Sequence, residues 1–410
     1  MTSLTSRRRR HTFYALAAGL VAAVLAPTLV YVGAKAISNS KAGKNALANV
    51  KPEQTFPQTP TAMLATVNAA NELTSVTVFV LAPDSDVSAA GYDQRGGSVV
   101  SVPINVDSGS GGPLLTLHDA YALGGEAELR IDLEAVINLT IDYSSIMTGD
   151  QVTEFLTGLP AVQATLPRDV LGADDAVLFP KGSVSLTSAQ LAQIMTTRSP
   201  TERGHLRQQN LDAVWAAIAS TVGTGRQDQT LRATTPVTFD EVAARLMAGP
   251  IASRGLLARP LDAQLNAEGR DIESLDRPDA ILVFASIAPA QMSRPASGLS
   301  YRIEAPPGYD QQVRKTIGIL LASGGNIVSV DLNSKPTAET TFRIFDATLA
   351  GVEPTDNAVF GTIKIETPDA RLGGIDETLA LGTDYLKNVD LSAPDATSTS
   401  TSVQPPETTG

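Results

Sequence analysis

The sequence predicts an α/β protein with an N-terminal transmembrane helix, a large folded domain and a small C-terminal α/β domain. Short β-branched runs alternate with segments of helical periodicity along most of the chain. An uncharged apolar run lies close to the N-terminus. A stretch containing Pro, Ser and Gly at residues 294–298 separates the second domain from the first.

The composition limits the classes of function. The 410 residues are 43% hydrophobic and 18% charged, which is typical of folded chains, and the length suggests more than one core. The formal net charge of −12 argues against nucleic acid as a partner. The chain has no cysteine, so disulfides, zinc–cysteine sites and a thiol nucleophile are excluded.

The N-terminal region predicts a single-pass membrane anchor. Residues 12–34 contain no Asp, Glu, Lys or Arg, and a helix of that length spans roughly the 30 Å of a bilayer core. The arginines at 7–10 favour a cytoplasmic N-terminus at residues 1–11, which places the bulk of the chain outside the cell. The alternative is a cleaved signal peptide, since Ala34-Lys35-Ala36 has the small-x-small pattern of a cleavage site, but the apolar run is longer than a usual signal core.

The large domain is expected at residues 59–293, after a polar, Pro-containing linker at 35–58. Its predicted elements come from β-branched runs, helical spacing and a Thr187-Ser188 cap signal. We expect strands at 75–81, 98–103 and 161–166, and helices at 114–123, 127–138, 152–156, 188–195, 206–222 and 239–247. The apolar run Ala280–Ile287 is of strand length.

The small domain is expected at residues 299–388. The predicted order is a strand at 299–304, a helix at 310–323 ended by Gly324-Gly325, and strands at 326–331, 341–345 and 375–379. From 391 to 410 the chain is rich in Ser, Thr and Pro and has no aromatic residue, so it is predicted to be a disordered tail.

Several degenerate motifs occur in an order that resembles the LytR-CpsA-Psr (LCP) family of cell-wall proteins. The first is Leu117-His118-Asp119-Ala120-Tyr121-Ala122-Leu123-Gly124-Gly125, and the second is Ile141-Asp142-Tyr143 with Phe155 and Leu159 downstream. The third runs from Leu186-Thr187-Ser188-Ala189-Gln190 through Arg198 and Arg203 to Arg207-Gln208-Gln209. Residues 299–388, which end in Leu381-Gly382-Thr383-Asp384-Tyr385, are similar to the LytR C-terminal domain.

This resemblance implies a mixed sheet flanked by helices, and it implies a chemistry. Members of the family resemble phosphotransferases that join a glycopolymer from a polyprenyl-pyrophosphate lipid to peptidoglycan. The family clamps the pyrophosphate with arginines and an aspartate-held magnesium ion, and it buries the lipid in a hydrophobic pocket.

The positions that match the family's charged residues are largely neutral here. Thr74 stands where an acid is expected, and Ile104 and Asn105 replace an arginine-aspartate pair. Gly204 occupies the place of a companion arginine. Losing the clamp and the metal carboxylate together would remove several kcal/mol of transition-state stabilisation, on the order of what such groups supply. The sequence therefore assigns no catalytic residue and no metal ligand, and no cofactor is expected.

The remaining candidates for phosphate or lipid-carrier binding are Arg198, Arg203, Arg207 and Gln208. Arg203 and Arg207 are four residues apart and are expected to share a helix face. The same residues also fit a solvated helix end. His118 and His205 have no partner pattern and read as ordinary residues.

Three hypotheses follow from the sequence. The first is a non-catalytic, membrane-anchored extracellular protein of the cell envelope that assists wall-polymer attachment or assembly by binding a polyprenyl-linked polymer, peptidoglycan or another LCP protein. The second is an active phosphotransferase that uses relocated residues, and only this reading requires magnesium. The third is a structural envelope scaffold.

Overall fold

The computed structural model describes residues 35, 53–83, 95–109, 114–225, 235–293, 298–345, 359–368 and 370–391. The predicted anchor at 12–34 and most of the predicted tail lie outside these ranges. No helix within them is both long enough and apolar enough to cross a membrane. The chain divides into two compact units, one of residues 1–54 with 369–371 and one of residues 55–368 with 372–410. The first unit contributes β1 (Glu53–Gln54), and β17 is Arg371–Leu372.

The first sheet of the large unit is mixed, and its strand order is β10-β4-β3-β2-β5. The central strands pair antiparallel, whereas the two edge strands pair parallel to their neighbours. The strands are β2 (Thr61–Val67), β3 (Leu73–Leu81), β4 (Gly97–Val102), β5 (Tyr143–Met147) and β10 (Ile251–Gly255). The structure is thus mixed α/β, as the alternation of elements predicts.

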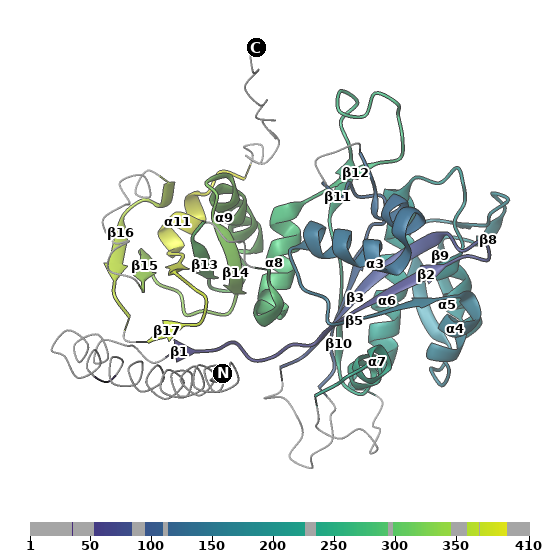
Figure 1. The fold of residues 1–410 in the computed structure, drawn as a ribbon, viewed down its shortest axis with the longest axis horizontal. Coiled ribbons are helices and arrows are strands. Elements are labelled where there is room, and N and C mark those ends of the chain that lie inside the picture. Colours follow the sequence, from purple (N-terminus) through teal and green to yellow (C-terminus); the bar gives the residue numbers. More distant parts are fainter. Residues whose placement is uncertain are drawn as a thin grey trace, which may run out of the picture. The chain divides into compact units, whose positions relative to one another are not determined.

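Side chains alternate between the two faces of this sheet, as strand geometry requires. Met63 and Val78 belong to one apolar core, while Leu64 and Phe79 belong to a second core on the opposite face. Helix α3 (Leu117–Ile137) lies against the first face. The helices against the second face are α4 (Gly149–Phe155), α5 (Ser188–Thr196), α6 (Gly204–Val222) and α7 (Phe239–Met247), as Figure 1 shows.

An aromatic cluster fills the second core. The ring of Phe79 lies 5.6 Å from Trp215, 5.8 Å from Phe239 and 6.3 Å from Phe155, measured between centroids. These separations are those of rings in direct contact. The space between the sheet and its helices is occupied by side chains at this point.

Local signals explain where the helices begin and bend. Thr116 and Asp119 form a capping box at the start of α3, and Thr187 and Gln190 form another at α5. Gly125 has φ +64°, which divides α3 at the gap between the two predicted helices. Most predicted helices and strands are present with small shifts of their ends.

One prediction of an element is wrong. Ala280–Ile287 does not form a strand, because it lies within helix α8 (Arg277–Ile287). Asp276 caps this helix by accepting from the Asp279 N–H, and Pro278 stands in its first turn. The helix is buried nearly all round, so its sequence shows no helical periodicity.

Three two-stranded sheets form separately from the first sheet. They are β6 (Val162–Leu166) with β9 (Gly182–Leu186), β7 (Val170–Leu171) with β8 (Val177–Phe179), and β11 (Ala258–Pro260) with β12 (Glu273–Leu275). A 3-10 turn, Pro289–Gln291, follows α8.

The second sheet has the order β14-β13-β18-β15-β16. It consists of β13 (Ser300–Glu304), β14 (Asn326–Asp331), β15 (Thr340–Ile344), β16 (Ile363–Glu366) and β18 (Glu377–Ala380), with helices α9 (Asp310–Ala322) and α11 (Thr383–Asn388). Gly324, at φ +80°, turns the chain after α9.

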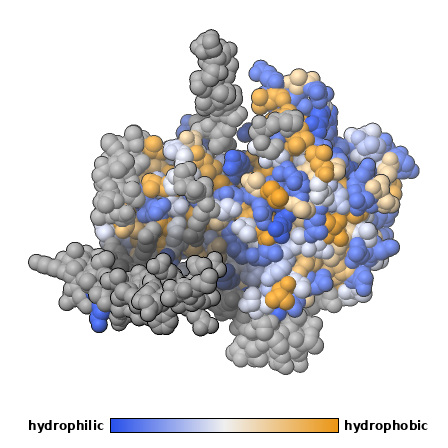
Figure 2. Space-filling view, in the orientation of Figure 1, coloured by the Kyte–Doolittle hydropathy of each residue, from blue (hydrophilic) through white to orange (hydrophobic). Residues whose placement is uncertain are grey.

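Helix α8 joins the cores of the two sheets. It contacts α3 as well as α9 and β14 (Figure 1). One continuous apolar cluster runs from Val78 through Ile281 to Ile317 and Leu379. The Arg314 guanidinium of α9 pairs with both carboxylate oxygens of Asp276 at the start of α8. On the face shown in Figure 2, hydrophilic and hydrophobic residues are intermixed.

Candidate functional site

Two of the four predicted site residues, Arg198 and Arg203, lie where three chain segments meet. Asn105 follows β4, Arg198 and Arg203 lie between α5 and α6, and Asp271 precedes β12. Backbone pairing fixes the first and last segments to each other, because the Glu273 N–H donates to the Asn105 carbonyl at 2.8 Å and the Asp107 N–H donates to the Glu273 carbonyl at 2.9 Å. We call this group the Asp271 cluster: Asn105, Arg198, Arg203, Gly204, Asp271 and Glu273.

Asp271 is the centre of the cluster. Its Oδ2 accepts from the Gly204 N–H at 2.8 Å and from the Asn105 amide at 2.5 Å. Gly204 is the first residue of α6, so the carboxylate satisfies a donor at a helix N-terminus, where the helix dipole favours negative charge. The carboxylate thereby fixes the start of α6 against the segment after β4.

The half-buried Arg198 and the exposed Arg203 face the same carboxylate. Arg198 Nη2 lies 3.9 Å from Asp271 Oδ2, and Arg203 Nη1 lies 3.7 Å from Oδ1. Arg198 also donates to the Asn105 side-chain oxygen at 3.3 Å. The side chain of Arg203 is 56% exposed and precedes α6 as its N-cap residue, so it does not share a helix face with Arg207.

Glu273 is buried beside this group. Its side chain is 1% exposed, and neither carboxylate oxygen completes a hydrogen bond. Burial and the charge of Asp271 raise the pKa of Glu273 to about 7, against the smaller opposing influences of the His205 backbone N–H and Arg198. His205 Nδ1 lies 3.8 Å from Glu273 Oε1.

The charge of Arg198 affects the pKa of His118. Burial and that guanidinium lower the pKa of His118, with partial opposition from Asp119 and Glu72. The imidazole is therefore held toward its neutral form near the cluster.

The Arg207 side chain is buried, and its hydrogen-bond donors are used inside the protein. Its guanidinium donates to four backbone carbonyls: Thr74 at 2.5 Å, Thr197 at 3.0 Å, Met195 at 3.0 Å and Ile194 at 3.3 Å. Burial and the Arg198 charge lower the pKa of Arg207 to about 10, so it stays protonated at neutral pH. Arg207 ties β3 to the end of α5 and presents little of its charge to solvent.

Gln208 is also turned inward. Its amide donates to Ser101 Oγ at 2.5 Å and to Asp212 Oδ1 at 2.8 Å. Burial raises the pKa of Asp212, and hydrogen bonds from the side chains of Gln208 and Ser101 to that carboxylate oppose the shift. The structure therefore brings Arg198 and Arg203 together at the Asp271 cluster and places Arg207 and Gln208 in the core behind it.

The neutral replacements have structural roles. Ile104 is buried in the first core, and Thr74 is fully buried in β3, where its carbonyl receives Arg207. A Cβ at Gly204 would lie 2.5 Å from Asn105 Nδ2 and 2.8 Å from Glu273 Oε1. A side chain at the position that matches the family's companion arginine would thus displace the side chains of Asn105 and Glu273.

The cluster does not fit a magnesium ion. Magnesium is usually bound in proteins through one or two carboxylates that are free to face it, with water completing the octahedral shell. Here Asp271 already accepts two hydrogen bonds and faces two guanidinium groups, and the described residues contain no group of three or more His, Cys, Asp or Glu suited to a metal.

Sequence reasoning missed Asp271 and Glu273. The signal was present as an acid–apolar–acid alternation, Asp271-Ile272-Glu273, which is the pattern of a short strand with both acids on one side. The segment lies between longer elements and carries no family motif, so nothing marked its acids as neighbours of Arg198.

Comparisons with known proteins give weak structural similarity. No family model matches the sequence, and no curated protein matches it. TagT of Bacillus subtilis is 14% identical with a TM-score of 0.39, covering 57% of this chain and 93% of its own. TagV of B. subtilis is 12% identical with a TM-score of 0.36, covering 52% and 95%. Lin1025 of Listeria innocua is 13% identical with a TM-score of 0.34, covering 55% and 96%.

TagT has been described as a LytR-CPS2A-Psr family protein with bound octaprenyl pyrophosphate, and also bound to LIIa-WTA. At these identities and TM-scores, the similarity does not establish that this chain belongs to the family.

Proposed function

We propose that this chain is a non-catalytic, membrane-anchored protein of the cell envelope, with an LCP-like scaffold and its bulk outside the cell. It takes part in wall-polymer attachment or assembly by binding a polyprenyl-linked polymer, peptidoglycan or another LCP-family protein. The ordered motifs in the sequence support the scaffold, and the geometry of the charged residues supports the loss of catalysis.

The observation that carries this proposal is that the Arg207 guanidinium is occupied by backbone carbonyls and not directed at a ligand. Phosphoryl transfer needs guanidinium groups aimed at developing negative charge. The donors of Arg207 are instead used by four backbone carbonyls. Turning this guanidinium toward a ligand would take a donor from all four carbonyls, although Met195 would keep the Thr66 hydroxyl at 3.0 Å. Each carbonyl left unsatisfied would cost about 1–3 kcal/mol.

The surroundings of the other two arginines support the same conclusion. Asp271 lies within 4.0 Å of both Arg198 and Arg203. A pyrophosphate would approach guanidinium groups that are already paired with the Asp271 carboxylate. Like charges at such distances oppose binding and would weaken any transition-state stabilisation.

The activity test uses the full-length protein in detergent with a labelled polyprenyl-pyrophosphate lipid and magnesium. Lipid binding and cleavage of the pyrophosphate bond are measured separately. We expect no magnesium-dependent cleavage above a protein-free control. Cleavage that is abolished by Arg198→Ala but not by Arg130→Ala, an exposed control on α3, would establish the phosphotransferase reading instead.

The topology test uses tags at both ends of the chain in intact cells or spheroplasts. We expect added protease to remove a C-terminal tag and to spare an N-terminal one, because the arginines at 7–10 precede the uncharged run. The opposite protection would contradict the orientation. A mature protein that begins at Ile37 would show that the anchor is cleaved.

A further inference from the structure

The Asp271 carboxylate lies where hydrogen-bond donors and positive charge converge from three chain segments. Its Oδ2 accepts from the Gly204 N–H at 2.8 Å and from the Asn105 amide at 2.5 Å. Arg203 Nη1 lies 3.7 Å from Oδ1, and Arg198 Nη2 lies 3.9 Å from Oδ2. A helix N-terminus and guanidinium groups are the means by which proteins commonly bind an oxyanion. In this chain, one of its own carboxylates stands in that position.

Both guanidinium groups keep hydrogen-bonding capacity. Their distances to Asp271 are longer than a direct hydrogen bond, so each forms an ion pair only. Arg198 donates to the Asn105 side-chain oxygen at 3.3 Å, and the side chain of Arg203 is 56% exposed. The Asp271 side chain is itself 25% exposed. An oxyanion from solvent would therefore reach both guanidinium groups if the carboxylate were absent.

The loop that carries the two arginines is fixed from its other side. Ser199 is fully buried, and its hydroxyl donates to the Asp175 carboxylate, which also accepts from the Thr201 hydroxyl at 2.8 Å. The Ser199 hydroxyl in turn accepts from the N–H groups of Thr201 and Glu202 at 3.1 and 3.2 Å. These contacts do not involve Asp271, so the loop is pre-organised without it.

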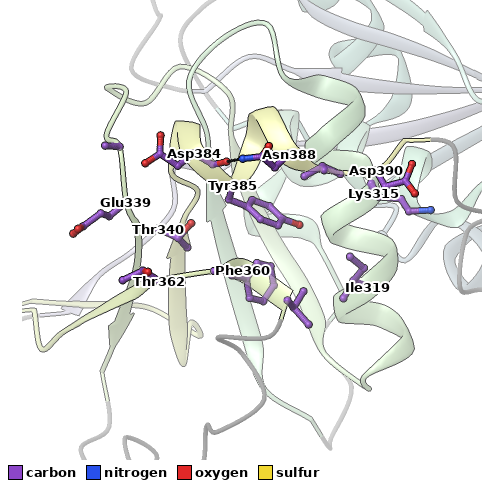
Figure 3. Close-up of a pocket in the computed structure, with 14 residues that line it drawn as sticks. Lys315, Ile319, Glu339, Thr340, Phe360, Thr362, Asp384, Tyr385, Asn388 and Asp390 are labelled. Carbon is purple, nitrogen blue, oxygen red and sulfur yellow. Dashed lines mark hydrogen bonds between the residues drawn. The ribbon is translucent and has the colours of Figure 1, made fainter.

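The cavity of the C-terminal domain does not offer a comparable arrangement. Its volume is about 600 Å³, and α9, the entry to β15 and α11 line it (Figure 3). Figure 3 shows the Glu339 and Asp384 carboxylates directed away from the Tyr385 ring. Lys315 is the basic residue among its described lining residues. Two guanidinium groups and a helix N-terminus meet at one point at the Asp271 cluster instead.

We infer that Asp271 is a built-in anion, which fills an oxyanion site formed by Arg198, Arg203 and the start of α6 and excludes external oxyanions from it. The inference rests on the proposed function and deepens it, because it names the residue that keeps a pyrophosphate away from the two arginines. Without Asp271, the same groups bind a phosphate or carboxylate oxyanion from solvent.

Binding of inorganic pyrophosphate to the full-length protein in detergent tests this role, by calorimetry without magnesium. The measurement is made at about pH 6, where the neighbouring Glu273 largely holds its proton. Asp271→Asn keeps an acceptor for the Gly204 N–H and removes the charge. We expect this variant to bind pyrophosphate at least about tenfold more tightly than the wild-type protein, because a like charge close to the ligand is lost.

Further variants locate the binding. Asp150→Asn removes an exposed acid from the first turn of α4 and is the matched control, so it should leave the weak wild-type binding unchanged. Adding Arg198→Ala and Arg203→Ala to Asp271→Asn should abolish the gain in affinity. Adding Arg130→Ala, an exposed arginine of α3, should preserve it.

Chemical rescue gives a second measurement. Asp271→Ala removes the carboxylate and leaves the Gly204 N–H without its acceptor, so the thermal midpoint should fall. Formate supplies a carboxylate of the size removed. We expect it to raise the midpoint of Asp271→Ala, and to leave the wild-type midpoint unchanged, relative to chloride at equal ionic strength. Near-ultraviolet circular dichroism follows the folded state of each protein.

Two binding outcomes would overturn the inference. One is equal affinity of the wild-type protein and Asp271→Asn for pyrophosphate, and the other is a gain that survives the loss of both arginines. If Asp271→Asn does not fold, the rescue decides, and a failure of formate to restore Asp271→Ala overturns the inference. Pyrophosphate binding by the wild-type protein without lipid cleavage would contradict this inference alone, whereas magnesium-dependent lipid cleavage would contradict the proposed function.

Discussion

Glu273 couples the stability of the fold to pH. Its carboxyl group is buried without a completed hydrogen bond, and its pKa is raised from 4.5 to about 7. The folded state therefore holds a proton that the unfolded state releases above pH 4.5. The stabilisation from this group is full below that pH, falls as pH rises toward 7, and is absent above it.

We expect the wild-type free energy of unfolding to lose about 3 kcal/mol from this group between pH 4.5 and 7. Glu273→Gln keeps the shape and removes the titration, so the variant should lose less stability over that interval. Urea denaturation at several pH values measures the difference between the two proteins. Parallel curves would contradict the role of Glu273, since Asp212 and Glu202 titrate in both proteins.

Arg207 is predicted to be required for folding rather than for ligand contact. Arg207→Met keeps much of the apolar stem and removes a donor from four carbonyls, of which Met195 keeps the Thr66 hydroxyl, so we expect a loss of about 3 kcal/mol or more. Arg130→Met, on the exposed face of α3, is the matched control and should cost about 0.5 kcal/mol or less. Thermal and urea unfolding compare them, and similar losses for the two variants would contradict this role.

At the scale of the element, the start of α6 depends on the absence of a side chain at Gly204. A Cβ there would press on Asn105 and Glu273, and the Asp271 carboxylate holds the backbone N–H in place. We expect Gly204→Ala to destabilise the fold by about 1–3 kcal/mol, although alanine favours helices by itself. Gly149→Ala at the first residue of α4, where the nearest atom would be 3.4 Å away, is the control. A stabilised Gly204→Ala protein would show that the segment after β4 moves aside to accommodate the new Cβ.

Most elements were predictable because their signals are local. The caps at Thr187 and Gly324 and the break at Gly125 mark ends and kinks within a few residues. Helix α8 was not predictable as a helix, because burial on all sides removes the period that distinguishes it from a strand. At the site, the sequence indicated Arg198 and Arg203, but their partner Asp271 is more than sixty residues away. Arg207 was misjudged because an arginine motif does not show which way the guanidinium turns.

At the scale of the whole molecule, the two sheets are expected to unfold together. Trp215 is the only tryptophan, and it lies in the core of the first sheet. Arg314 belongs to α9 and pairs with Asp276 at the start of α8. We expect Arg314→Ala to lower the urea midpoint that Trp215 fluorescence reports, with far-ultraviolet circular dichroism following the same curve. Lys364→Ala, on the exposed edge of the second sheet, is the control.

An unchanged Trp215 midpoint in Arg314→Ala, with a separate transition in circular dichroism, would show that the sheets fold independently. Limited proteolysis gives a second measure. If cleavage at residues 294–298 releases two stable fragments, the apolar cluster through α8 does not join them. If the nicked chain stays associated, the shared core holds it.

Because α8 packs in the cores of both sheets, neither domain can be transferred to another protein as an independent folding unit. A C-terminal domain joined to another protein would have to bring α8 with it or find an equivalent surface for α9. Substitutions on the two sides of that helix are then constrained by one another over evolutionary time. Descendants of this protein should therefore change their domains in step, and shuffling at 294–298 should yield few soluble hybrids.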